Sequence, residues 1–414
     1  MPKRPLHATP ASHVEASSQP ARTGAPLPDE VTPLLGNRTP RQFMRRYWQK
    51  KPLLIRQAIP ELAAPLTRDE LFELADLDNV ESRLITHFRN TWNLEHGPFA
   101  PDELPSIKKR EWTLLVQGVN LHDERAHALI NRFRFIPDAR LDDLMISYAT
   151  DGGGVGPHFD SYDVFLLQVK GKRRWRFGAQ RDLSLKPGLP LKVLQNFEPE
   201  EDCVLEPGDM LYLPPHIAHD GIAEGECMTC SIGFRAPSAH ELTAQFLYHL
   251  AEQAGDAPNA RGNARYRDPE QPPVDRPAAL PALLLERVGA ILASIDWNEK
   301  DIAKFLGSYL SEPKSNVVFD PPERALNQQK FVERVKKTGL TLDRKTILLY
   351  DAKSYFVNGE AEKLSASAKK WLPEFADTRR LEAKRFLTLT ADSAMTSLLH
   401  EWYRAGWIQT DPSA

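Results

Sequence analysis

The stretch MISYATDGGGVGPHFDSYDVFLLQVKGKRRWRF, residues 145–177, decides how this chain is interpreted. At its centre is the triplet His158-Phe159-Asp160. On a β-strand, side chains alternate between the two faces, so His158 and Asp160 are expected to project to the same side. The glycine-rich approach at residues 152–156 lets the backbone turn sharply or come close to a ligand. The triplet therefore predicts that one imidazole and one carboxylate converge.

A second imidazole follows in EPGDMLYLPPHIAHDG, residues 206–221. Both His216 and His219 come after the Pro-Pro turn, and spacing alone does not separate them. We favour His219 because the Asp-Gly that follows leads into the next predicted strand, where a sheet would fix the imidazole. Two histidines and one carboxylate form the facial triad that suits non-haem Fe(II) and leaves positions open for a co-substrate and dioxygen. The predicted catalytic metal ligands are therefore His158, Asp160 and His219.

Iron of this type normally takes 2-oxoglutarate as its second electron source, and the distal carboxylate of that co-substrate needs a basic partner. Three basic residues, Lys172, Arg173 and Arg174, follow the predicted turn at Gly171. Strand alternation sends Arg173 to the face opposite its two neighbours. We therefore predict that Arg173 binds the co-substrate and that its neighbours are surface charges.

Short predicted strands follow the triplet at close spacing, separated by glycine and proline. They cover residues 162–169, 173–177, 202–205, 209–213 and 227–234. Many short strands joined by such turns predict a mainly β barrel or double-sheet jelly roll of the cupin type. The mouth of a barrel is a suitable place for a small ligand and a metal.

The chain upstream of this barrel predicts helical additions. The sequence TPRQFMRRYWQKKPLLIRQA, residues 39–58, predicts an amphipathic helix and then a short strand at residues 53–55. Thr67 and Glu70 form a capping box that begins a second helix. Residues 80–87 and 112–119 predict further strands.

Composition divides the chain into four parts. Residues 1–30 are rich in proline, alanine and serine and predict a disordered tail, and residues 31–237 form the catalytic domain. Residues 238–315 predict a helical region with too few helices to bury its apolar surface. Packing against the barrel or against a second subunit would complete it, so a homodimer is a hypothesis. Residues 316–414 predict a small α+β, winged-helix-like domain, in which Asn358-Gly359 is a strong hairpin signal.

Charge and cysteine content limit the function classes. The 53 basic and 56 acidic residues give a net charge of −3, so no global field favours nucleic acid, and no direct nucleic-acid binding is expected. Three cysteines are too few for a disulfide framework and favour a reducing compartment, the cytoplasm. Cys227 and Cys230 are interpreted as core residues rather than a zinc or redox pair, because no second pair accompanies them.

No targeting segment is predicted. The chain has no run of about 18 apolar residues that could span a membrane. Residues 1–30 lack the apolar region of a secretory signal. A mitochondrial transit peptide is the less favoured alternative, because Glu15, Asp29 and Glu30 stand among many prolines.

Several long motifs resemble those of a known family. DDLMISYATDGGGVGPHFDSYDVFLLQ, GKRRWRFG, LEPGDMLYLPP and SIGFRAP are similar to segments of the bacterial ribosomal oxygenases. These are JmjC-domain, cupin-type protein hydroxylases that act on an arginine of large-subunit ribosomal protein sixteen. The resemblance covers most of residues 31–237, and the C-terminal pattern is compatible with that family's helical dimerisation region and winged-helix module.

The resemblance implies a double-stranded β-helix and a role for each candidate residue. His158, Asp160 and His219 match the family's Fe(II) ligands, and Arg173 matches the residue that pairs with the distal carboxylate of 2-oxoglutarate. His216 falls where the bacterial relatives have a glycine. The implied activity is hydroxylation of a protein arginine, with histidine hydroxylation, as in human relatives, or another protein substrate as alternatives.

Two other classes of function stay open. A metal-dependent cupin acting on a small molecule would not require Arg173, and a non-catalytic ribosome- or RNA-binding scaffold would not require His158. An acidic rim would favour a cationic target, although ordinary surface carboxylates are the simpler interpretation. The candidates for such a rim are Asp142, Asp143, Asp151 and Asp163.

Overall fold

The computed structural model describes residues 24–89, 91–256, 265–389 and 393–410. Most of the predicted tail, residues 1–30, lies outside the described residues. The described chain begins at Gly24, and Asp29 already makes a 2.8 Å ion pair with Arg41. In the described part of the chain, no helix is both long enough and apolar enough to cross a bilayer.

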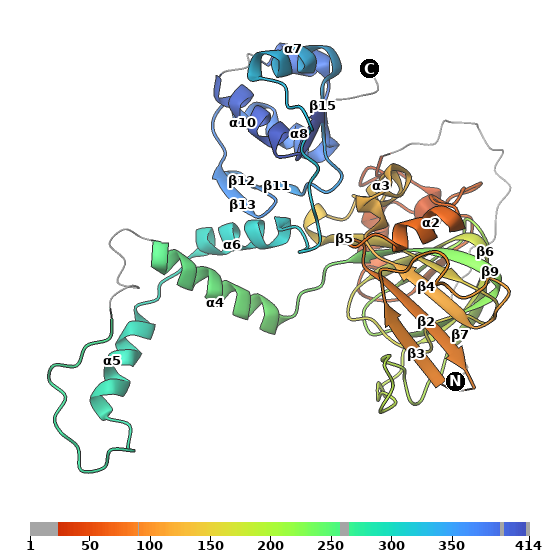
Figure 1. Cartoon of the computed structure of the whole chain (residues 1–414), viewed down its shortest axis with the longest axis horizontal. Coiled ribbons are helices and arrows are strands. Elements are labelled where there is room, and N and C mark those ends of the chain that lie inside the picture. The colour runs from red at the N-terminus through yellow and green to blue at the C-terminus, as the bar shows by residue number, and fades with distance from the viewer. Residues whose placement is uncertain (1–23, 90, 257–264, 390–392, 411–414) are drawn as a thin grey trace. The chain divides into compact units, whose positions relative to one another are not determined.

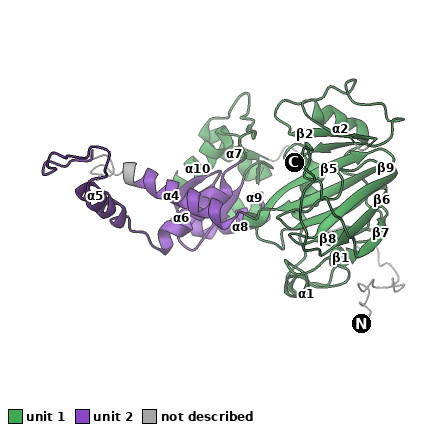
Figure 2. Ribbon diagram, turned by 90° about the horizontal axis from the view of Figure 1, so that it is seen from below, with its two compact units in different colours: residues 1–236, 314–346, 380–414 green, residues 237–313, 347–379 purple. Residues whose placement is uncertain are grey.

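The described chain divides into two compact units (Figure 2). Unit 1 comprises residues 1–236, 314–346 and 380–414, and unit 2 comprises residues 237–313 and 347–379. The segment predicted to be winged-helix-like therefore contributes to both units. The predicted boundaries at residues 237 and 315 stay predictions.

The first part of unit 1 carries most of the strands (Figure 1). Its helices are η1 (Pro33–Leu35), α1 (Pro40–Arg46), α2 (Arg68–Ala75), η2 (Val119–Leu121), α3 (Glu124–Asn131) and η3 (Asp138–Arg140). Its strands are β1 (Leu53–Ile55), β2 (Ser82–Phe88), β3 (Thr91–His96), β4 (Trp112–Val116), β5 (Leu141–Ala149), β6 (Val164–Gly178), β7 (Glu201–Leu205), β8 (Met210–Leu213) and β9 (Ala218–Phe234). The predicted helix and strand at residues 39–55 are present, and so is the capping box of Thr67 and Glu70.

These described strands form one antiparallel sheet in the order β1-β8-β6-β9-β5-β4-β2-β3, with β7 paired to β6. The two long strands β6 and β9 stay paired over most of their length, and their register shifts on either side of Lys170. Each strand therefore takes part in both halves of a double-stranded β-helix, the predicted fold. The aromatic ring of Phe43 on α1 lies 5.4 Å from that of Phe165 on β6, so this helix packs on the barrel.

The predicted turn at Gly171 is wrong, because β6 runs through this residue without a break. Gly171 has a φ of +62°, and a Cβ added there would lie 2.1 Å from the carbonyl oxygen of Glu226. The glycine therefore allows an irregularity within the paired strands rather than a reversal of the chain. Pairing continues beyond it, where Lys172 lies opposite Glu224.

Two further differences concern strands of low apolar content. β3 was not predicted, and β9 begins at Ala218 rather than at residue 227. The first half of β9, AHDGIAEGE, is polar and lacks a strand-like pattern, but it pairs with β6 along its length. Pairing with a neighbour, which sequence periodicity does not report, decides the structure of this segment.

The first segment of unit 2 holds the helices α4 (Ala239–Asp256), α5 (Ala282–Ala293) and α6 (Glu299–Ser311). It also holds the strands β11 (Leu348–Tyr350), β12 (Ser354–Val357) and β13 (Glu360–Lys363), followed by η5 (Ala368–Lys370) and α8 (Leu372–Thr378). β12 and β13 form the predicted hairpin around Asn358-Gly359, both at positive φ. α6 packs closely on it, because a Cβ at Gly307 would lie 2.4 Å from the ring of Phe356.

The C-terminal segments of unit 1 form a small α+β body. Its helices are α7 (Gln328–Thr338), α9 (Ala383–Thr388) and α10 (Ser393–Arg404), and its three-stranded sheet has the order β14-β10-β15. These strands are β14 (Arg380–Leu381), β10 (Leu340–Leu342) and β15 (Ile408–Thr410). The rings of Phe331 and Tyr403 stack 4.9 Å apart between α7 and α10.

Candidate metal centre

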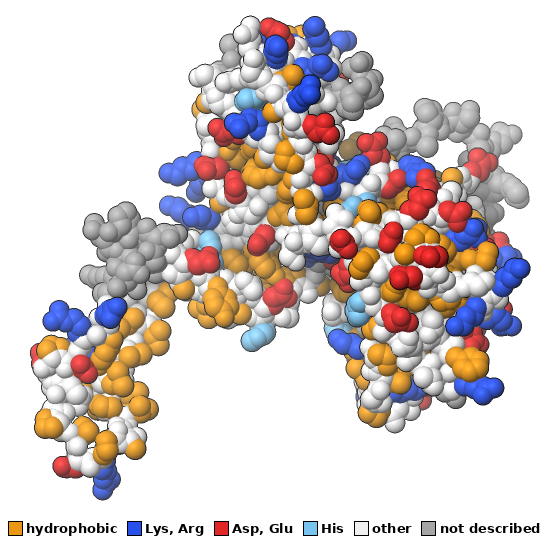
Figure 3. Space-filling model, in the orientation of Figure 1, with side chains coloured by type: hydrophobic (Ala, Val, Ile, Leu, Met, Phe, Trp, Pro, Cys, Tyr) orange, Lys and Arg blue, Asp and Glu red, His pale blue; other side chains and the backbone are white. Residues whose placement is uncertain are grey.

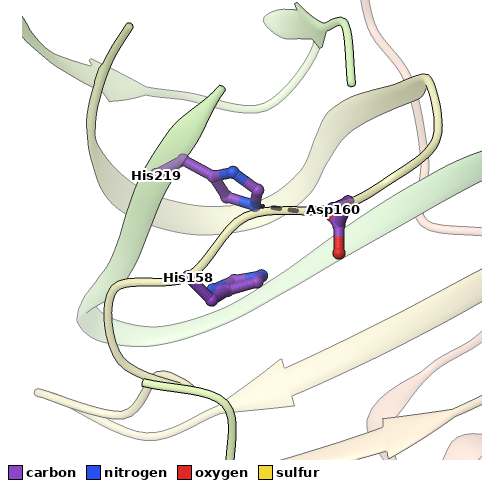
Figure 4. A group of neighbouring side chains, drawn as sticks. All are labelled: His158, Asp160 and His219. Atoms are coloured by element: carbon purple, nitrogen blue, oxygen red, sulfur yellow. Dashed lines mark ion pairs between the residues drawn. The ribbon is translucent and has the colours of Figure 1, made fainter. Parts of the chain in front are cut away.

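The three predicted ligands lie together at one end of the barrel (Figure 4). One nitrogen from each imidazole and one oxygen of Asp160 all lie within 4.8 Å of one another. His219 belongs to β9, whereas His158 and Asp160 lie in the loop between β5 and β6. The predicted strand at the triplet is therefore wrong, although the predicted convergence is present.

A single antiparallel bridge holds the loop in place. The N–H of His158 donates to the carbonyl of His219 over 2.9 Å, and the N–H of His219 donates to that of His158 over 2.8 Å. The two imidazoles consequently face each other, with ring centroids 4.2 Å apart. Further backbone hydrogen bonds hold the loop on either side of His158, from Leu194 to Pro157 and from His216 to Asp160, both over 2.7 Å.

Backbone carbonyls orient both rings. Nδ1 of His158 lies 2.9 Å from the carbonyl oxygen of Gly156, and Nδ1 of His219 lies 2.9 Å from that of Ile217. A carbonyl can only accept, so each Nδ1 donates, and the neutral form of either ring then has its lone pair on Nε2. Burial, together with the neighbouring imidazole, lowers the pKa of His219 to about 4, although the Asp160 carboxylate acts in the opposite direction. Neutral imidazoles with exposed Nε2 lone pairs are the form that binds a divalent metal.

Asp160 completes the cluster, with its Oδ2 3.6 Å from Nε2 of His219. His216 does not join it. Its side chain is exposed, its φ is +64°, and its backbone N–H donates to the carbonyl oxygen of Asp160 over 2.7 Å. That left-handed conformation favours glycine, so His216 occupies a tight turn while His219 faces the barrel interior.

Arg173 is buried inside the same barrel, 5% exposed. Its Nη1 donates to the Ser147 hydroxyl over 3.0 Å, whereas its Nε and Nη2 have no hydrogen-bond partner among the described residues. As predicted, its neighbours are surface charges: Lys172 pairs with Glu206 and Arg174 pairs with Asp202.

Strand register places Arg173 on the same face as the metal cluster. Residues directly opposite each other in an antiparallel pair share a face, and β6 sets Arg173 opposite Ala223 and Phe177 opposite His219. Trp175 lies between them, with its ring 5.9 Å from that of His219 and also 5.9 Å from the Arg173 guanidinium carbon. A cation with two unpartnered N–H groups thus faces a two-histidine, one-carboxylate cluster across an aromatic ring.

This arrangement fits a metal with a chelating dicarboxylate. Two imidazole nitrogens and one carboxylate oxygen suit Fe(II) and leave coordination positions open. An unpartnered buried guanidinium is costly, and a carboxylate accepting from Nε and Nη2 would remove that cost. Sequence reasoning did not include Ser147, whose contact with Arg173 depends on the pairing of β5, β9 and β6.

The four candidate rim acids have different surroundings. Asp163 is buried and accepts from the Tyr212 hydroxyl over 2.5 Å, and Asp151 pairs with Arg110 over 2.8 Å, so both have structural partners. Asp142 is partly exposed, whereas Asp143 is 7% exposed. Burial and the charges of Asp160 and Asp143 raise the pKa of the Tyr162 hydroxyl. Asp143 accepts from the backbone N–H of Gly118 over 3.2 Å, and a Cβ built on Gly233, which pairs with Val164, would lie 3.6 Å from its Oδ1. Asp143 therefore lies beside the start of β6, next to the loop that carries Asp160.

The fold and this cluster define a JmjC-type barrel, and comparisons with known proteins agree. A JmjC domain model matches residues 128–242, and a ROXA-like winged helix model matches residues 294–409. The chain is 33% identical over 370 residues to the ribosomal protein uL16 3-hydroxylase of Escherichia coli, covering 88% of this chain and 96% of that protein. It is 38% identical over 220 residues to a probable ribosomal oxygenase of Haemophilus influenzae, covering 52% of each chain.

A solved structure extends this similarity to the fold. YcfD, a ribosomal oxygenase from Escherichia coli in complex with cobalt and 2-oxoglutarate, superposes with a TM-score of 0.74 and 32% identity. The match covers 89% of this chain and 97% of that one. This chain belongs to the JmjC-domain ribosomal oxygenase family.

Proposed function

We propose that this chain is a 2-oxoglutarate- and Fe(II)-dependent oxygenase that hydroxylates an arginine of the large-subunit ribosomal protein uL16. The relative from Escherichia coli bears the name of a hydroxylase of this ribosomal protein. The observation that carries the proposal is the cluster of His158, Asp160 and His219 on the same barrel face as the unpartnered guanidinium of Arg173.

His158, Asp160 and His219 would hold Fe(II) through two Nε2 atoms and one carboxylate oxygen. When bound, Fe(II) and 2-oxoglutarate use dioxygen to convert a substrate C–H into C–OH, with release of succinate and carbon dioxide. The carbonyls of Gly156 and Ile217 keep both imidazoles in the required tautomer and orientation.

Arg173 would bind the distal carboxylate of 2-oxoglutarate through Nε and Nη2, which form one edge of its planar fork. The Ser147 hydroxyl, which accepts from Nη1, fixes the plane of that fork before the co-substrate enters. The buried ring of Trp175 lies 5.9 Å from both the His219 ring and the Arg173 guanidinium carbon and would form an apolar wall beside the co-substrate. A cupin acting on a small molecule without a keto acid would not need such a buried, half-satisfied arginine.

Asp143 and Tyr162 are the groups we propose for recognition of the substrate guanidinium. Asp143 is nearly buried. Burial is the main cause that raises the pKa of the Tyr162 hydroxyl, and the charges of Asp160 and Asp143 raise it further. A buried carboxylate favours a cation with planar N–H donors over a neutral side chain. Arginine therefore suits this side of the site better than histidine.

A second copy of the chain is the partner we propose for α5. No residue of α5 is buried, and Leu285, Ile291 and Leu292 are 58%, 55% and 61% exposed. Figure 3 shows hydrophobic side chains gathered along this helix. A homodimer would cover this apolar face, which is larger than scattered surface residues would explain.

A ribosomal protein substrate also supports the cytoplasm as the site of action.

The decisive experiment is mass spectrometry of uL16 fragments incubated with enzyme, Fe(II), 2-oxoglutarate and oxygen. We expect a gain of one oxygen on an arginine, and its loss with Asp160→Ala as the control. A gain located on histidine would correct the residue while keeping the reaction. Succinate without a modified fragment would reject uL16 as substrate, and no succinate at all would favour a non-catalytic scaffold.

A further inference from the structure

Two adjacent acids stand at a β-bulge near the start of β5. Leu141 pairs with Phe234 and Leu144 pairs with Ile232, so β5 contains one more residue than β9 across this interval. Consecutive strand residues normally point to opposite faces, but a bulge disturbs that alternation. Asp142 and Asp143 consequently reach the same cation.

That cation is Lys314, the first residue of the second segment of unit 1. Its Nζ lies 2.9 Å from Oδ1 of Asp142 and 3.6 Å from Oδ2 of Asp143. The backbone nearby is attached to the barrel, because the side-chain amide of Asn316 donates to the carbonyl of Asn79 over 3.1 Å. The Lys314 side chain is 43% exposed, whereas that of Asp143 is only 10% exposed. The ion pair therefore joins a long, partly exposed lysine side chain to a nearly buried carboxylate.

Asp143 also belongs to the metal-facing part of β5. Beyond the bulge, Met145 and Ser147 follow it at alternate positions, and the Ser147 hydroxyl contacts the buried Arg173. A Cβ built on Gly233 would lie 3.6 Å from Oδ1 of Asp143, and Gly233 pairs with Val164, four residues after Asp160. Lys314 thus contacts a carboxylate that lies beside the start of β6, next to the loop that carries His158 and Asp160.

We propose that Lys314 is an internal stand-in for the substrate cation: it neutralises Asp143 in the free enzyme and gives way to the substrate guanidinium. This inference rests on the proposed function. A nearly buried carboxylate without a cation is costly, so a cation is needed there before the substrate binds as well as afterwards. The 3.6 Å distance to Asp143 is longer than the 2.9 Å to Asp142, so Lys314 can retain Asp142 while it releases Asp143.

The exchange would make Lys314 a determinant of specificity. A guanidinium can offer two parallel N–H groups to Asp143, whereas the ammonium of Lys314 offers a single point of contact. A neutral side chain in place of the lysine would leave Asp143 without this cation, although the backbone N–H of Gly118 still donates to its Oδ2 over 3.2 Å. The lysine therefore competes with the substrate side chain for Asp143. A cation with better geometry than the ammonium overcomes this competition.

The test compares the full-length protein with Lys314→Met and with Lys314→Arg, which keeps the charge. The probes are a uL16 fragment containing the arginine and the same fragment with citrulline in its place, both fluorescently labelled. At pH 8 we expect Lys314→Met to bind the arginine fragment about five-fold more tightly, the scale of a partly exposed ion pair. Lys314→Arg offers Asp143 a second guanidinium, so this variant should bind the arginine fragment no more tightly than wild type. Citrulline brings no positive charge to Asp143 and should gain less than the arginine fragment from Lys314→Met.

Steady-state hydroxylation should show the same change as a five-fold lower KM at unchanged kcat. In an Asp143→Asn background, Lys314→Met should have no effect, because the carboxylate under competition is gone. Unchanged or weaker arginine binding overturns the inference, and so does a joint loss of kcat and thermal stability, which would indicate a structural role. If the wild type neither binds nor hydroxylates the fragment, the proposed substrate and this inference both fail, whereas hydroxylation without a Lys314 effect overturns this inference alone.

Discussion

The barrel interior and α5 leave opposite kinds of side chain without a partner. In the barrel, Arg173 is 5% exposed and two of its N–H groups have no acceptor among the described residues. On α5, Leu285 and Leu292 are 58% and 61% exposed. Polar groups away from water and apolar groups in water are both unfavourable, so each region indicates a ligand of complementary character. The barrel favours a small dicarboxylate with a metal, and the helix favours a protein surface.

Removal of a metal ligand should have the largest effect. Asp160→Asn keeps the volume but loses the negative charge of the cluster, and we expect hydroxylation to fall by more than about 100-fold, since even residues behind the ligands cost that much in metal centres. Isothermal titration with Fe(II) under anaerobic conditions would show the loss of affinity. Lys172→Asn, a surface change on β6, is the matched control and should bind metal normally.

Arg173→Met should come next. The variant removes the guanidinium but keeps a similar length, so we expect the KM for 2-oxoglutarate to rise by roughly 30-fold, the value of a charge-assisted bidentate contact. Arg174→Met, one residue away and exposed, should leave this KM unchanged. An equal effect of both variants would contradict the distinction between a buried co-substrate site and a surface ion pair.

Association through the α5 surface should be sensitive to charged substitutions and should not depend on metal. Leu285→Glu with Leu292→Glu should dissociate the homodimer, because each buried leucine contributes about 1.5–3 kcal/mol. Light scattering coupled to size exclusion at micromolar concentration would detect the monomer. Val318→Glu, an exposed apolar position outside α5, is the matched control. A wild-type monomer under these conditions would show that α5 is covered by something other than a second copy.

The smallest effect is expected at Ser147. Ser147→Ala removes one hydrogen bond to Arg173 but leaves the guanidinium in place, so the KM for 2-oxoglutarate should rise about five-fold, equivalent to about 1 kcal/mol. An effect as large as that of Arg173→Met would mean that the serine itself contacts the co-substrate. A double-mutant cycle of the two variants separates these cases.

The sequence contained the residue types of the site but not their positions in the fold. His158 and Asp160 were paired by an argument from strand alternation, yet they lie in a loop, where the bridge to His219 holds them. The predicted alternation of Arg173 with its two neighbours is present, because β6 pairs in regular register with β9 from Lys172 to Gly178. Local periodicity therefore predicted which side chains on β6 share a face. At the triplet it predicted that His158 and Asp160 lie close together, but from a strand that is not present.

From residue types and short spacings, the sequence predicted the barrel class, which the structure confirms, and proposed a two-histidine, one-carboxylate ligand set with a basic partner, which stay predictions. Only the tertiary structure separated His219 from His216, since one lies on a paired strand and the other in a left-handed turn. Only the tertiary structure also brought Ser147 to Arg173 and Lys314 to Asp143, because these contacts join segments far apart along the chain. Long-range strand pairing and burial, which no local pattern encodes, decided them.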